Sequence, residues 1–166
     1  MSENNLPVKS DKPLPAVVDS ASGREFVTMY IEGQLFGIPV LQVQDVLEPL
    51  KITRVPLSPR EVAGSLNLRG RIVTAIDVRT RLGLSPREGN VKCMSVVVES
   101  GGEFYSLIVD QVGEVMTLAA AEFEKTPATL DDRWREIADG IYRLQESLLV
   151  VIDVKRLLRL EELTAA

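Results

Sequence analysis

The sequence predicts a mainly β protein made of two similar small β-barrels with short helices. The chain contains many short runs of β-branched and aromatic residues, and tight glycine-containing turns separate several of them. Long amphipathic helices do not separate these runs, as they would in a doubly wound parallel sheet. The runs also recur in two copies along the chain, which is why paired barrels are predicted rather than one open sheet.

The internal repeat consists of two pairs of matching segments. Ile76-Asp-Val-Arg79 returns as Ile152-Asp-Val-Lys155, and Phe36–Val46 aligns with Tyr105–Val115. Two copies of a unit of roughly 70 residues indicate two similar halves. The copies are too few and too long for a solenoid.

The first half opens with a hairpin. Residues 1–22 hold three prolines among polar residues and predict a flexible tail. Phe26–Ile31 and Leu35–Val40 then read as two strands joined across Glu32-Gly33-Gln34. Pro39 cannot donate a ladder hydrogen bond, so it marks the end or an edge of its strand. Val40–Leu47, with apolar residues at helical spacing, predicts a short helix.

The remaining elements of the first half surround a polar turn. Asn67-Leu-Arg-Gly70 is predicted to bend the chain, because Asn tolerates a positive φ and Gly adopts it without steric cost. The other predicted elements are a strand over Ile52–Val55, a helical turn over Arg60–Leu66, a strand over Ile72–Val78 and a helical turn over Arg79–Leu84.

The second half repeats this order. Its predicted elements are a strand over Lys92–Glu99, a turn over Ser100–Glu103, a strand over Phe104–Val109, a short helix over Gln111–Met116, a strand leading into a hairpin near Gln145–Ser147, a strand over Leu148–Val154 and a terminal helix over Lys155–Leu163. The predicted organisation is a tail over 1–22, a two-barrel domain over 23–160 and a C-terminal end over 161–166.

Composition excludes several classes of function. A formal net charge of −5 argues against nucleic acid or an anionic membrane as the main partner. No apolar run is long enough to span a membrane, and the polar N-terminus does not resemble a signal peptide. The single Cys93 is expected to pack in an apolar run, so we expect a cytoplasmic protein without membrane insertion.

The sequence offers little chemistry for catalysis. It has no histidine, only one cysteine and no glycine-rich phosphate loop, so no catalytic, cofactor or metal site is predicted. The aspartates 45, 77, 110 and 153 could be imagined as an acidic phosphorylation pocket. A receiver domain needs adjacent acids at a strand end and alternating βαβ units, which are not visible. The recurring Asp77 and Asp153 are instead predicted to cap the helical turns that follow them.

From about Gly23 to Leu160 the chain resembles the CheW family of bacterial chemotaxis coupling proteins. The matching segments are Phe36–Val46, Ile52-Thr-Arg54, Asn67-Leu-Arg-Gly70, Ile76-Asp-Val-Arg79 and Ile108–Val115. The resemblance implies two five-stranded SH3-like β-barrels around a shared hydrophobic core. It also implies a non-enzymatic adaptor that couples chemoreceptors to a CheA-type histidine kinase in arrays beneath the inner membrane. In the family, the groove between the barrels takes the receptor's cytoplasmic helical tip, and barrel edges meet the kinase's regulatory domain.

The resemblance assigns six residues to partner binding: Val43, Asp45, Asn67, Leu68, Arg69 and Gly70. Arg69 matches the family's turn arginine and can pair with an acidic group of a partner. Asp45 stands where the family commonly has Glu.

Alternatives remain open at this point. Asp45 and Arg69 can equally form an ion pair inside the protein, and Val43 can be buried rather than face the groove. Asn67 and Gly70 can act only as turn formers. A CheW-like scaffold for a kinase pathway other than swimming chemotaxis is the second functional interpretation.

Overall fold

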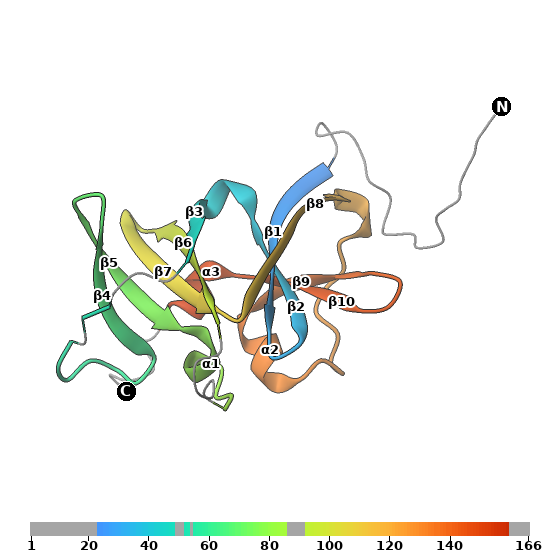
Figure 1. Ribbon diagram of the computed structural model, residues 1–166. Helices are drawn as coiled ribbons and strands as arrows, with labels where there is room; N and C mark the ends of the chain where they lie inside the picture. Colours follow the sequence, from blue (N-terminus) through green and yellow to red (C-terminus); the bar gives the residue numbers. More distant parts are fainter. Residues whose placement is uncertain (1–22, 49–51, 54, 86–91, 160–166) are drawn as a thin grey trace.

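The protein folds into two five-stranded sheets, which the computed structural model describes for residues 23–48, 52–53, 55–85 and 92–159 (Figure 1). The predicted tail over 1–22 and the end over 161–166 lie outside these ranges. Sheet A contains, in spatial order, β8 (Gln111–Ala119), β1 (Gly23–Ile31), β2 (Gln34–Pro39), β10 (Leu148–Ile152) and β9 (Ala138–Arg143). Sheet B contains β3 (Val43–Leu47), β6 (Met94–Ser100), β7 (Glu103–Val109), β5 (Arg71–Asp77) and β4 (Val62–Leu68).

The two sheets have the same order of strand pairing, and each combines a hairpin from one half of the sequence with strands from the other half. In each sheet a hairpin pairs in parallel with a strand from the other half of the sequence, β2 with β10 and β7 with β5. The β1–β2 hairpin of the first half therefore belongs to sheet A with β8, β9 and β10. The β6–β7 hairpin of the second half belongs to sheet B. Each sheet contains strands from both halves, so neither half forms a sheet by itself.

Two single bridges extend the pairing at the sheet edges. Thr53, after β3, pairs with Ser65 of β4, and Glu124, after β8, pairs with Ile141 of β9. In both sheets, the chain that follows one edge strand thus reaches the opposite edge strand. Gly64 makes the approach in sheet B possible, because a Cβ there would lie 2.3 Å from the Thr53 carbonyl oxygen.

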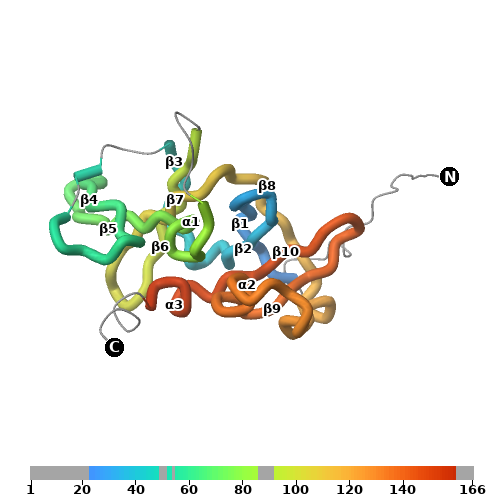
Figure 2. Tube along the Cα trace, turned by 90° about the horizontal axis from the view of Figure 1, so that it is seen from below, coloured from blue at the N-terminus to red at the C-terminus, as the bar shows by residue number. Residues whose placement is uncertain are grey.

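Helical structure is short and lies at the junction of the sheets. The helices are α1 (Val78–Arg81), α2 (Asp132–Ile137) and α3 (Val154–Leu157), with 3₁₀ turns η2 (Val40–Gln42) and η3 (Ala120–Glu122). In Figure 2 the three α-helices lie together between sheet B on the left and sheet A on the right. Arg81 joins two of them, since its buried guanidinium donates to the Leu157 and Arg156 carbonyls at 2.8 and 3.0 Å.

Side-chain alternation along the strands builds three apolar clusters. On β10, Val150 and Ile152 pack into a core shared by both sheets, whereas Leu149 and Val151 pack into a smaller cluster inside sheet A. The corresponding cluster inside sheet B contains Leu66, Val73, Ala75 and Ile108. Strand β10 is therefore apolar on both faces and packs the two sheets against one another. Burial of each fully buried side chain contributes about 1.5–3 kcal/mol to the stability of the fold. The shared core that the resemblance implies is present.

Three predicted helical segments are wrong. Val40–Leu47 forms only the turn η2 and then strand β3, Gln111–Met116 lies in strand β8, and Arg60–Leu66 enters strand β4. Valines at positions 40, 43 and 46 fit helical spacing, but β-branched side chains also suit a half-buried strand. The strand forms because β3 pairs with β6, and β8 with β1, over long sequence distances. The terminal helix is described over Val154–Leu157 and Pro39 ends β2 as predicted.

The recurring aspartates cap helices, as predicted. Asp77 Oδ1 accepts from the Arg79 backbone N–H at 3.1 Å, and Asp153 Oδ1 accepts from the Arg156 N–H at 3.3 Å. Both therefore satisfy a donor that the first helical turn leaves without an intrahelical partner.

Removing either cap is expected to destabilise the protein without changing its fold. Asp77→Ala and Asp153→Ala should each lower the free energy of unfolding by about 1 kcal/mol, measured by urea denaturation. Asp77→Asn and Asp153→Asn keep a capping oxygen and should cost less. Equal stability of the alanine and asparagine variants would contradict the capping role.

Candidate functional site

A two-residue turn places Arg69 at the tip of the β4–β5 hairpin. Leu68 pairs with Arg71 across the turn, and Arg69 and Gly70 take φ values of 54° and 84°. Positive φ at both turn positions is the I′ geometry that suits the twist of a hairpin. Asn67, which we expected at a positive φ, instead lies in β4, and its Oδ1 accepts from the Gly70 N–H at 3.0 Å.

Arg69 forms an ion pair with Asp45 on β3. Arg69 Nη2 lies 2.9 Å from Asp45 Oδ2, while Asp45 Oδ1 accepts from the Val46 N–H at 2.9 Å. The pair joins strands at opposite ends of sheet B, so this sheet curls back on itself. The internal pair that the sequence left open therefore exists. The Arg69 side chain nevertheless remains 78% exposed, against 26% for Asp45.

The apolar residues of the predicted site are less exposed. Val43 is half-buried and packs against the shared core, and Leu68 is half-buried against the cluster inside sheet B. Ile72, which pairs with Asn67, is 72% exposed and was missed by the sequence analysis. Strand alternation could have found it, because Val73 and Ala75 occupy the inward face of the cluster. We define the hairpin surface as Asp45, Asn67, Arg69, Gly70 and Ile72.

A second charged cluster lies at the junction of the sheets. Arg79 donates through Nε and Nη2 to the two carboxylate oxygens of Asp110, at 2.9 and 2.7 Å. Asp110 also accepts from the Glu32 N–H in the β1–β2 turn, at 2.7 Å. The hydrogen bond to Asp110 raises the pKa of Arg79 above its usual range. The bidentate pair thus connects α1, next to sheet B, with a turn of sheet A.

A hollow opens beside this junction. A pocket of about 850 Å³ is lined by Glu48, Arg79, Lys92, Cys93, Met94, Asp110 and Gln111. These residues come from β6, from α1, from the start of β8 and from connections next to the strands. Cys93 is half-buried and packs against the cluster inside sheet B, consistent with its predicted packing role.

The four aspartates considered as an acidic pocket do not form one. Asp45 pairs with Arg69, Asp110 pairs with Arg79, and Asp77 and Asp153 cap different helices. Within the described part of the chain, no three or more His, Cys, Asp or Glu side chains gather in a group that could hold a metal ion. None of the helices in the described ranges has the length and apolar character needed to cross a membrane.

Comparison with known proteins identifies relatives across most of the chain. The CheW-like domain family matches residues 25–162. The chain is 28% identical to the chemotaxis protein CheW of Klebsiella aerogenes and 26% identical to that of Helicobacter pylori, covering in each case 85% of this chain and 85% of the relative. The crystal structure of the scaffolding protein TtCheW from Thermoanaerobacter tengcongensis superposes with a TM-score of 0.70 at 28% identity, over 78% of this chain and 88% of that one. The chain therefore belongs to the CheW-like domain family.

Proposed function

We propose that this protein is a chemotaxis coupling adaptor, which connects chemoreceptors to a CheA-type histidine kinase. The observation that carries the proposal is the family match over 25–162, together with relatives named as chemotaxis and scaffolding proteins over nearly their whole length. Surface contacts, rather than chemistry, then perform the function. This interpretation is preferred to a scaffold for another kinase pathway because the relatives reported above are named for chemotaxis.

The geometry of the sheets supports two contact regions. The hairpin surface comes from β3 and the β4–β5 hairpin of sheet B. It exposes the Arg69 guanidinium and the apolar Ile72 side chain, which suit the kinase's regulatory domain. Val43 and Leu68 lie next to this surface in the sequence and pack against the shared core and the cluster inside sheet B, respectively. The pocket between Met94 and Gln111 lies where the sheets meet and suits the helical tip of a receptor. Both partners would meet the adaptor in cytoplasmic arrays, where several weak contacts linked together give a high overall avidity.

We further infer that each sheet, with its single bridge, is one SH3-like barrel of a duplicated fold. The matching order of pairings and the matching bridges at Ser65 and Ile141 support this inference. Duplication also accounts for the recurring Ile-Asp-Val segments, which end β5 and β10 at equivalent places.

Reconstitution tests the function directly. Autophosphorylation of the cognate kinase should rise severalfold when receptor and this protein are both present, and not when either is omitted. A kinase of another pathway serves as the control. Stimulation of only that second kinase would contradict the chemotaxis assignment.

A further inference from the structure

A rigid turn between β3 and β4 displays a leucine. In the Val55–Ser58 turn, the Ser58 N–H and hydroxyl both donate to the Val55 carbonyl, at 3.4 and 2.8 Å. Pro56 fixes the first central position of the turn. Leu57 occupies the second, with φ at 64°.

Leucine is unfavourable at this position for two independent reasons. The left-handed backbone region brings Cβ too close to the following carbonyl oxygen, so Gly or Asn is the usual choice. The Leu57 side chain is also 104% exposed, so no contact within the described chain compensates for this strain. Exposure alone would need no explanation, and Leu41 is 91% exposed without a positive φ. Strain and full exposure together point to a function outside the chain.

The base of the turn is held firmly. The Val62 N–H donates to the Pro59 carbonyl at 3.0 Å, and Thr53 and Ser65 exchange two backbone hydrogen bonds of 2.8 Å. The loop is thereby fastened to β4 on both sides of Leu57. Because the backbone on either side of Leu57 is hydrogen-bonded in this way, the loop itself loses little conformational entropy when a partner binds.

We propose that Leu57 is an anchor that inserts into an apolar socket on the kinase's regulatory domain. This inference rests on the proposed function. A folded domain can offer a deep socket for one leucine, whereas a helical receptor tip offers only shallow grooves between its side-chain ridges. Val55, 42% exposed, widens the apolar contact, and the exposed Arg60 beside it favours acidic residues at the rim of the socket.

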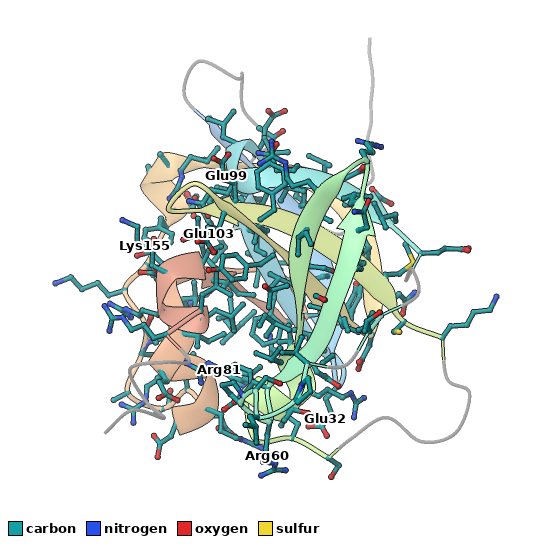
Figure 3. The ribbon with its side chains drawn as sticks, turned by 90° about the vertical axis from the view of Figure 1, so that its left-hand side faces the viewer. Glu32, Arg60, Arg81, Glu99, Glu103 and Lys155 are labelled. Carbon is teal, nitrogen blue, oxygen red and sulfur yellow. The ribbon has the colours of Figure 1, made fainter. Side chains whose placement is uncertain are left out.

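The anchor is separate from the hairpin surface. The strand β4 (Val62–Leu68) lies between the Leu57 turn and the Arg69 turn, a length of about 20 Å. In Figure 3, Arg60 lies at the bottom of this face of the molecule and Glu99 near its top. The adaptor would then have two kinase contacts on sheet B, separated by the length of β4.

Three variants test the anchor, because the loss of Leu57 should affect thermal stability and kinase affinity in opposite directions. Leu57→Asn relieves the strained backbone, so its melting temperature should rise by about 2–4 °C. Its Kd for the kinase regulatory domain, measured by calorimetry, should nevertheless increase at least about tenfold because the buried leucine is lost. Leu57→Ala keeps the strain and should lose the same affinity without gaining thermal stability. Leu41→Asn, the matched control, should change neither quantity.

The outcomes separate the inference from the proposed function. Wild-type protein that binds neither the kinase domain nor the receptor tip would overturn both. Wild-type binding that both Leu57 variants retain would overturn the anchor alone. Loss of self-association in Leu57→Asn, seen by sedimentation with kinase binding intact, would assign the leucine to a second copy of the chain and also overturn the proposal.

Discussion

Replacing Arg69 by alanine is expected to remove most receptor-stimulated kinase activity and to leave the fold nearly unchanged. The pair with Asp45 is solvent-exposed on the Arg69 side, so its loss should cost about 0–1 kcal/mol of stability. A guanidinium that pairs with a carboxylate of the kinase contributes more, since hydrogen bonds to charged groups are worth about 1.5–3 kcal/mol. We therefore expect stimulation in the reconstituted assay to fall about tenfold or more, with a melting temperature within a few degrees of wild type.

A matched control separates this effect from the loss of an exposed ion pair. Arg143 on β9 pairs with Glu124 at 3.0 Å and is 60% exposed, so Arg143→Ala removes a similar pair from sheet A. This variant should stimulate the kinase normally. The charge exchange Asp45→Arg with Arg69→Asp restores an internal pair but presents the wrong charge to a partner. Recovery of stimulation in the exchanged protein would show that the pair serves the fold and would contradict the partner contact.

Replacing Asp110 by alanine is expected to produce the largest loss of stability among these variants. Arg79 and Asp110 are only 17% and 18% exposed, so the variant leaves a mostly buried guanidinium without its main acceptor. It also removes the acceptor of the Glu32 N–H, which holds the β1–β2 turn. Allowing for the partial exposure, we expect the free energy of unfolding in urea to fall by about 2–4 kcal/mol.

Two further variants test whether the unpaired Arg79 guanidinium causes the loss of stability in Asp110→Ala. Glu124→Gln breaks only the exposed pair with Arg143 and should cost less than about 1 kcal/mol. Combining Arg79→Met with Asp110→Ala removes both members of the junction pair and should recover part of the stability, because no buried charge is left unpaired. A loss below 1 kcal/mol in Asp110→Ala would mean that the shared core alone holds the junction.

Local features of the fold could be predicted from the sequence because neighbouring residues determine them. Gly33, Gly70 and Gly102 each occupy a positive φ in a hairpin turn that the sequence indicated. Pro39 ends its strand, and Asp77 and Asp153 cap the turns that follow them. Each of these outcomes depends on the backbone preference or the hydrogen-bonding reach of one side chain.

The candidate site could be predicted only in part from local sequence features. The motif located the Arg69 turn, but Arg69 rather than Asn67 takes the positive φ there. Ile72 was missed, and so was the contact between Arg79 and Asp110, which lie in different segments of the chain.

The sequence by itself determined the hairpins and the mainly β class, since these depend on short stretches of chain. Tertiary structure decided whether the valines of β3 and β8 form strands, because a spacing that suits a helix becomes a strand once β6 and β1 offer hydrogen bonds. It also decided that each sheet combines strands from both parts of the chain, and that Asp45 meets Arg69 across the edges of one sheet. These outcomes have one physical reason. The free energy that stabilises each of them comes from residues far apart along the chain, which only the folded arrangement brings together.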